Sequence, residues 1–374
     1  MSAKYIDEAR RIMTICNSCR YCEGFCAVFP AMELRRTFTD QDLKYMANLC
    51  HNCRDCYYAC QYAPPHTFDL NVPKSLAKLR LETYEESTWP RALSGLFKNS
   101  GRAVLLATSF CVLTLLLVTA ALNGFSLPFE TYTGENTFYQ VLPYKAIVSF
   151  FMVIGLLVFF CLIKGFFNYW QSTGETLSDF FDPRANITAI WDVLRLKYLD
   201  GGGYGCNYPN NKFSMIRRNF HHGVFYGFML CFASTAIAAF YDHFLSSPAP
   251  YPFFSLPVLL GTTGGISIVI GCGGLLFLKE KMDRAPADIK GLNMDVGFIL
   301  LLFLTSFSGL LLLLLRATPF MGALLIIHIG IVAAFFILMP YGKFIHGILR
   351  YAALVKNARE QLINNTKKNN TEKK

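Results

Sequence analysis

Long apolar runs separated by shorter polar segments occupy the last three quarters of the chain. Each run reaches about 20 residues, the length at which a helix rising 1.5 Å per residue crosses a hydrocarbon layer of about 30 Å. Helices of soluble proteins rarely stay apolar on every face for so long, so the runs predict membrane-spanning helices. There are six of them, at residues 103–122, 146–167, 220–245, 256–278, 296–315 and 320–341.

Residues 1–100 instead mix charged and apolar positions, as a small soluble domain does. Within them, 38–49 is predicted to be a helix with Thr39 or Asp40 as its N-cap. The first residues hold acidic groups and no apolar core of a signal peptide, so we expect the N-terminus to stay in the cytoplasm. The sequence therefore predicts an all-α protein: a helical domain over 1–100, then a six-helix transmembrane bundle over 101–350.

Two polar segments remain outside this scheme. The longest connection, 168–219, contains a predicted amphipathic helix at 187–198 and a glycine-rich turn at 201–205. A connection of this length is more often functional than idle, with a segment that lies on the surface and seals the bundle as the alternative. The basic tail, 351–374, is rich in Asn and Lys, and we expect it to be disordered.

Charge is distributed unevenly around the predicted spans. The 374 residues include 35 Lys and Arg against 25 Asp and Glu, a net charge of +10. With the N-terminus inside, 33 of the 35 basic residues fall on the cytoplasmic side, and only Lys145 and Arg316 fall outside. The positive-inside rule then predicts both termini in the cytoplasm of a bacterium, with the spans in its inner membrane. The positive charge is explained by the lipid bilayer, and no nucleic-acid partner is expected.

Eight of the thirteen cysteines form two runs with the spacing C-x2-C-x2-C-x3-C, 34 residues apart. In two-cluster ferredoxins the first three thiolates of such a run bind one [4Fe–4S] cluster and the fourth binds the other cluster. The first predicted ligand set is Cys16, Cys19, Cys22 and Cys60. The second predicted ligand set is Cys50, Cys53, Cys56 and Cys26.

Two other uses of these cysteines are less consistent with the sequence. Disulfides are disfavoured in the cytoplasm, and zinc sites more often show paired CxxC units separated by a dozen residues or more. With four thiolates for each cluster no iron is left open, so we expect electron transfer rather than catalysis at the clusters. The other five cysteines are predicted to be bystanders, of which Cys111, Cys161, Cys231 and Cys272 are expected to be apolar packing groups.

Five of the seven histidines lie in or at the ends of two predicted spans, and ionisable residues there are candidates for function. Haem b requires two imidazoles that face each other across a bundle. The five candidates are His221, His222 and His243 in the third span and His328 and His346 in the sixth.

Antiparallel spans sort these histidines into two levels. We expect an inner haem between His222 and His346, with His221 as the alternative ligand, and a possible outer haem between His243 and His328. His328 and His346 are 18 residues apart, which on one continuous helix places them on one face about 27 Å apart. Gly223 and Gly227 would leave room for the macrocycle.

No motif for a nucleotide, flavin or organic substrate accompanies these sites. The sequence has no G-x-G-x-x-G after a strand, no Walker loop and no nucleophile elbow. The chain must therefore receive its electrons from a partner.

Three stretches resemble the tricarballylate or citrate utilisation protein B family: ICNSCRYCEGFCAVFPAMELRRTF, LCHNCRDCYYACQYAPPHTF and WDVLRLKYLDGGGYGCNYP. The resemblance implies a membrane partner of a soluble FAD-dependent tricarballylate dehydrogenase, one that reoxidises its flavin and passes electrons to the quinone pool. It also implies a helical ferredoxin domain and a membrane part similar to the haem b subunit of respiratory nitrate reductase, the gamma type.

Two other functions stay open at this stage. The same chain could oxidise quinol and feed a cytoplasmic reductase, since sequence does not give the direction of electron flow. It could also be a membrane redox sensor without turnover, which would bind a regulator through the segment 168–219.

Overall fold

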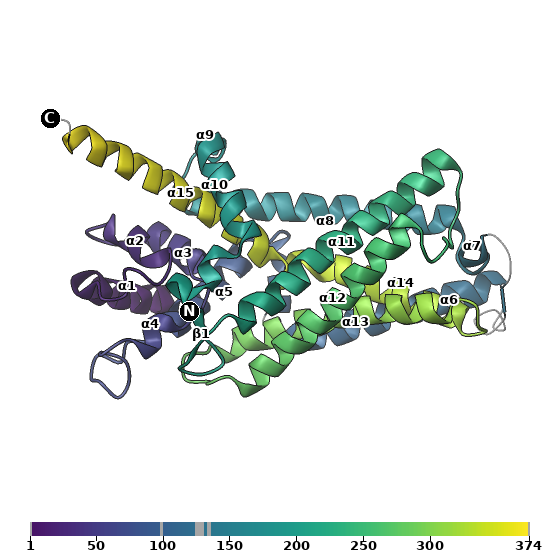
Figure 1. Cartoon of the computed structure of the whole chain (residues 1–374), viewed down its shortest axis with the longest axis horizontal. Helices are drawn as coiled ribbons and strands as arrows, with labels where there is room; N and C mark the ends of the chain where they lie inside the picture. Colours follow the sequence, from purple (N-terminus) through teal and green to yellow (C-terminus); the bar gives the residue numbers. More distant parts are fainter. Residues whose placement is uncertain (1, 98–99, 124–130, 133–135, 373–374) are drawn as a thin grey trace.

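The computed structural model describes residues 2–97, 100–123, 131–132 and 136–372. Short helices gather at one end of an elongated molecule, and long helices run side by side through the rest of it (Figure 1). The chain ends in the same region as the short helices, so both described termini lie toward one end of the long axis.

The N-terminal domain packs five α-helices around a buried apolar core that includes Met13, Phe29 and Leu43. Thr39 is the N-cap of the third helix and forms a capping box with Asp42, which confirms the predicted start of that helix. The helices are α1 (Ser2–Cys19), α2 (Val28–Glu33), α3 (Asp40–Leu49), α4 (Asp55–Tyr58) and α5 (Val72–Ser87), followed by the 3-10 turn η1 (Arg91–Phe97).

Six helices in the described residues are long and apolar enough to cross a membrane, as the apolar runs predict. Their outward side chains are apolar too: Leu106 and Phe110 expose 69% and 70% of their surface. An exposed apolar belt of this kind needs lipid around it, so the chain is a multi-pass membrane protein. The helices are α6 (Ser100–Asn123), α8 (Tyr144–Ser172), α11 (Ile216–Leu245), α12 (Leu256–Lys281), α13 (Ile289–Leu315) and α14 (Met321–Leu338), with the short α7 (Thr137–Val141) at the end far from the N-terminal domain (Figure 1).

The sixth span breaks where the sequence analysis treats it as continuous. After α14 the chain makes the 3-10 turn η5 (Met339–Tyr341), which contains Pro340, and restarts as α15 (Ile345–Glu372). Pro340 has no N–H to continue the helix. His328 and His346 therefore lie on different helices, and the prediction that they share one helical face is wrong.

Helix α15 also corrects the predicted disordered tail, because it continues to Glu372. Its Ala352 and Val355 are fully buried, and Arg359 forms an ion pair with Glu175 at 2.5 Å. Packing and ion pairing thus order the part that composition alone marks as disordered. Residues 373–374 of the predicted tail lie outside the described residues.

The connection 168–219 folds back onto the N-terminal domain. Gly202 has a positive φ of 71°, and a Cβ there would lie 2.8 Å from the carbonyl oxygen of Gly24, so only glycine allows this approach. Its elements are α9 (Leu177–Phe180), α10 (Pro183–Leu194), η3 (Lys197–Leu199), η4 (Gly201–Gly203), β1 (Cys206–Asn207) and β2 (Phe213–Ser214).

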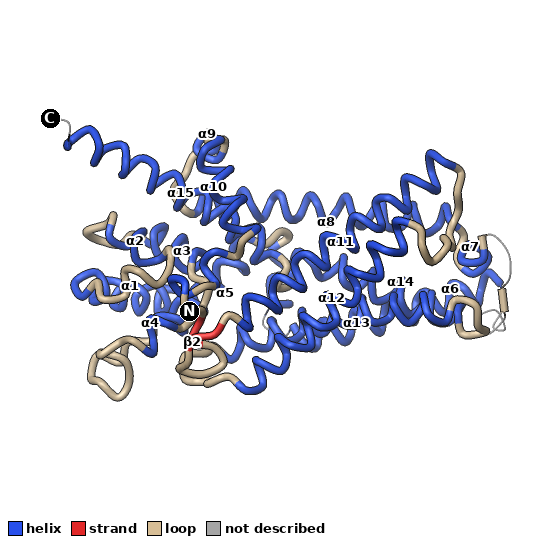
Figure 2. Tube along the Cα trace, viewed as in Figure 1, coloured by secondary structure: helices blue, strands red, loops and turns tan. Residues whose placement is uncertain are grey.

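Strands β1 and β2 pair antiparallel, with Cys206 opposite Ser214. This small hairpin, red in Figure 2, is the one departure from the predicted all-α class in the described part of the chain. Gly205, directly before β1, has a positive φ of 98°. The described structure is otherwise mostly helical.

Candidate metal centres and histidine pair

The four cysteines of the first predicted set face one cavity of about 240 Å³. Burial, followed by the nearby thiols of Cys22, Cys60 and Cys19, raises the pKa of the Cys16 thiol to about 12. Cys60 belongs to the second run in the sequence, so its place beside Cys16 is the crossed arrangement that the spacing predicts. Cys19 is exposed, which leaves this set open to solvent on one side.

The second set is more deeply placed. Cys50, Cys53 and Cys56 are buried and line a smaller cavity together with Cys26. A hydrogen bond to Cys53, followed by burial and the thiols of Cys50 and Cys56, raises the pKa of the Cys26 thiol well above its usual range. Cys26, the last cysteine of the first run, thus lies among the first three of the second.

Both groups fit the donor set of a [4Fe–4S] cluster, in which each of four thiolates binds one iron. A single metal ion needs three or more ligands around one point, and within the described residues no three His, Cys, Asp or Glu side chains form such a site. The Cys ligands and their division into two sets remain a prediction, and Cys56 lines both cavities.

Sequence reasoning missed two residues beside the second set. Cys206 of β1, predicted to be a bystander, lies next to the Cys53 thiol, and its Sγ donates to the Leu199 carbonyl oxygen at 3.4 Å. The backbone N–H of Asn207 donates to Asp55 Oδ1 at 2.7 Å. The one sequence signal for this contact was the position of Cys206 directly after the glycine-rich turn.

Asp55 lies between Cys53 and Cys56 in the sequence and is fully buried. Burial and the neighbouring Cys53 thiol raise the pKa of Asp55 to about 8. The segment 168–219 therefore does more than seal the bundle, because it encloses the second set of cysteines.

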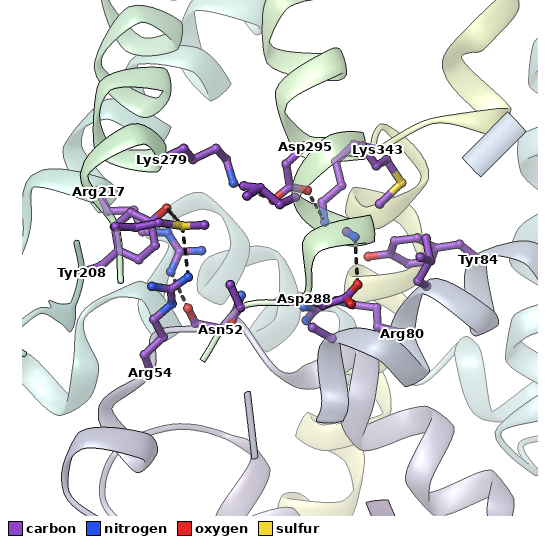
Figure 3. Close-up of a pocket in the computed structure, with 17 residues that line it drawn as sticks. Asn52, Arg54, Arg80, Tyr84, Tyr208, Arg217, Lys279, Asp288, Asp295 and Lys343 are labelled. Atoms are coloured by element: carbon purple, nitrogen blue, oxygen red, sulfur yellow. Dashed lines mark hydrogen bonds and ion pairs between the residues drawn. The ribbon is translucent and has the colours of Figure 1, made fainter. Parts of the chain in front are cut away.

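A polar cavity of about 50 Å³ lies between the N-terminal domain and the adjacent ends of α11, α12 and α13 (Figure 3). On its far wall Asp295 is held between Lys279 and Lys343, at 2.7 and 2.8 Å. Asn52 and Arg54 line both this cavity and the cavity of the second set. The second set is thus the one next to the membrane helices.

His221 of α11 faces His346 of α15, with ring centres 6.4 Å apart. If a haem were bound here, these two imidazoles would be the side chains that hold its iron. The Nδ1–H of His346 donates to the Lys343 carbonyl oxygen at 2.5 Å, as in metal-binding histidines whose other nitrogen is the ligand. The Nδ1 of His221 is buried without a hydrogen-bond partner in the described structure.

The structure therefore favours His221, the predicted alternative, over His222 as the partner of His346. The His222 ring instead lies 5.7 Å from the Tyr226 ring and near the backbone of Leu194. Neighbours on a helix point about 100° apart, so only one of the two histidines can face α15.

The predicted outer pair is not brought together. His328 turns toward α13, where its Nδ1 lies 3.0 Å from Ser308 Oγ and its ring lies against Gly309. His243 is exposed at the end of α11, with its ring 4.9 Å from that of Phe244.

The glycines of α11 also have a different role from the one predicted. Gly227 packs against Gly264 of α12, where a Cβ would lie 2.8 Å from the carbonyl oxygen, and Gly223 approaches Ser267 on the same helix. They hold α11 close to α12.

Two family profiles match the chain over nearly its whole length. Residues 98–367 match citrate utilization protein B, and residues 9–86 match the Fer4-like domain of citrate utilization protein B. The chain belongs to the citrate utilization protein B family. An Escherichia coli member, described as citrate utilization protein B, is 48% identical over 357 residues, which cover 95% of this chain and 92% of the relative. No solved structure matches the chain.

Membership confirms the family resemblance predicted from the cysteine runs and the glycine-rich segment. A Fer4-like domain with clustered cysteines indicates iron–sulfur clusters, and these imply an electron-transfer role.

Proposed function

We propose that the chain is a membrane electron-transfer protein. It reoxidises the reduced flavin of a cytoplasmic FAD-dependent dehydrogenase of the tricarballylate type, within citrate utilisation. Electrons pass through two [4Fe–4S] clusters and one haem b to the quinone pool.

The observation that carries this proposal is the order of the sites along the molecule. The first cysteine set opens to solvent through Cys19, and Tyr21 at the rim of its cavity is 73% exposed. The second set is buried against the membrane helices, beside the segment 168–219. The His221–His346 pair lies next to it, between the first turns of α11, a spanning helix, and the start of α15.

This order gives each end a partner of suitable chemistry. The exposed first set is where a soluble flavoprotein can approach. A quinone is dissolved in the bilayer and is reached only from the helical bundle.

The electrons and protons of this exchange balance. Oxidation of one reduced flavin releases two electrons and two protons, and reduction of one quinone consumes two of each. A [4Fe–4S] cluster or a haem, when bound, transfers one electron at a time. The protein's own contribution is to hold the two thiol sets and the two imidazoles in line and to exclude water from the second set.

Orientation is part of the proposal. With the N-terminal domain in the cytoplasm, 33 of 35 basic residues lie on the cytoplasmic side of the spans. The first set then faces the compartment in which a soluble dehydrogenase works.

Anaerobic flavin reoxidation by membranes that contain the protein tests the proposal. Cys16→Ala and Cys50→Ala should each abolish reoxidation by added quinone, because each removes a ligand from one of the two sets. Cys111→Ala, a buried cysteine of α6 far from both sets in sequence, is the control and should leave the rate unchanged. Full rates in both ligand variants would refute the role of the clusters.

A further inference from the structure

Four arginines surround the loop that carries the second cysteine set. Three of them donate to backbone carbonyls of residues 47–52. Figure 3 shows three of the four, Arg54, Arg80 and Arg217. The four are Arg54, Arg80, Arg217 and Arg350.

The contacts hold the guanidinium groups directly against the ligand loop. Arg350 donates to the carbonyl oxygens of Cys50 at 3.0 Å and Asn48 at 3.3 Å. Arg80 donates to the same Cys50 carbonyl. Arg217 donates to the carbonyl oxygens of Asn52 at 2.7 Å and His51 at 3.1 Å.

Arg54, between Cys53 and Cys56 in the sequence, is only 2% exposed. It donates to the Asp283 carbonyl oxygen at 2.8 Å, and its Nε is buried without a partner in the described structure. Arg54 and Arg217 both lie over the Tyr208 ring, at 4.6 and 4.9 Å from its centre.

None of these four guanidinium groups has an ion pair with a carboxylate among the described residues. Other arginines do: Arg35 pairs with Asp42 and Glu360, both at 2.5 Å. Asp295 is already held by two lysines. Asp55 is the carboxyl that lies against the second set. The second set is therefore surrounded by four guanidinium groups and one carboxyl group.

The first set has a different environment. Cys19 is exposed, and the other three of its cysteines are partly exposed. The cation on its cavity wall is Arg20, whose relative exposure places it in solvent. Solvent weakens the effect of an exposed charge, whereas buried charges act through a low dielectric.

A [4Fe–4S] cluster gains negative charge on reduction, and its potential depends on net charge, hydrogen bonding and exposure. Burial alone disfavours the added charge, while nearby cations favour it. We propose that Arg54, Arg80, Arg217 and Arg350 hold the second cluster at a higher reduction potential than the first. This inference rests on the proposed function, because it assumes that both sets carry clusters.

Two of these arginines also link the second set to the histidine pair. Arg217 precedes His221 by one helical turn on α11, and Arg350 follows His346 by one turn on α15. Arg217 and Arg350, which attract the electron to the second cluster, therefore belong to the same two helices as His221 and His346. Electrons collect next to the histidine pair, which favours flow from the dehydrogenase to the membrane over the reverse direction.

An EPR-monitored redox titration of the purified full-length protein tests the inference. In the wild type, the signal that disappears in Cys50→Ser should have the higher potential. Arg350→Gln should lower that potential alone, with at least a tenfold change in the equilibrium between the two clusters, which is about 59 mV for one-electron couples. Arg350→Lys keeps the charge and should retain most of the difference.

Arg359→Gln is the matched control, on the same helix but about 13 Å further along it and already paired with Glu175. It should leave both potentials unchanged. If Arg350→Gln fails to assemble, Arg80→Gln tests the same effect in the same direction.

The EPR titration distinguishes failure of the proposed function from failure of the difference in potential. A folded wild-type protein without cluster signals would refute the proposed function. Two clusters with the first at the higher potential, or with a gap that neither Gln variant changes, would refute this inference alone.

Discussion

Replacement of His221 should remove haem b, whereas replacement of its neighbour His222 should not. The ring centres of His221 and His346 lie 6.4 Å apart, whereas the His222 ring lies beside that of Tyr226. Side-chain ends lie about 6 Å from a helix axis, and successive residues point about 100° apart, so neighbouring side chains end about 9 Å from each other. His222 cannot cover that distance unless α11 unwinds.

The expected loss of bound haem follows from the number of iron ligands removed. Loss of an outer-shell partner already costs a metal site about 10–100-fold in affinity, and loss of an axial ligand should cost at least as much. We therefore expect His221→Ala and His346→Ala to retain less than about a tenth of the wild-type haem. His222→Ala should retain nearly all of it.

The assay is the reduced-minus-oxidised visible spectrum of protein purified in detergent, normalised to protein and to iron bound by the clusters. The iron content shows that each variant still folds in its N-terminal domain. Haem loss in His222→Ala together with haem retention in His221→Ala would refute the assigned pair. A wild type without any b-type spectrum would refute the haem step.

Three further predictions follow from other parts of the molecule. Cys60→Ser should lose the same EPR signal as Cys16→Ser, although Cys60 belongs to the other cysteine run. If Cys60→Ser instead lost the signal that Cys50→Ser lacks, each run would bind its own cluster. Glu360→Gln should release α15 from Arg35, with which Glu360 pairs at 2.5 Å. The lost ion pair should reduce the stability of this packing by about 1–2 kcal/mol. Proteolysis should then cleave α15 faster than in the wild type, and equal cleavage rates would contradict this prediction. A green fluorescent protein fused to the C-terminus should fluoresce, because the charge distribution predicts that this end lies in the cytoplasm. A dark, full-length fusion would refute the predicted topology.

The spans and the cysteine groups were predictable because each depends on local sequence. An apolar run as long as the bilayer is thick indicates a membrane span regardless of the rest of the chain. The x2 spacing brings three thiols of one run together, so only the crossed fourth cysteine had to come from elsewhere.

Contacts between distant segments were not predictable in this way. Cys206 meets Cys53 across 153 positions, through a fold of the segment 168–219 that only the structure shows. The choice between His221 and His222 depends on the rotation of α11. Gly223 and Gly227 set that rotation by packing on α12, and His221 points about 200° away from Gly223.

Two predictions are wrong, the continuous sixth span and the disordered tail. Pro340 marks the break after α14, but the apolar run continues across it and conceals the break. The polar composition of 351–374 indicates disorder, yet buried alanines and ion pairs to the N-terminal domain and the segment 168–219 order α15.

Quinone reduction in sealed vesicles tests the central claim most directly. Purified protein is reconstituted with a long-chain quinone, and reduced flavoprotein is added on the outside under anaerobic conditions. The account predicts that the flavin is reoxidised and that one quinol forms for each flavin, and that Cys16→Ala vesicles do neither. Quinol formation that is equally fast with Cys16→Ala, or flavin that stays reduced with the wild type, would contradict it.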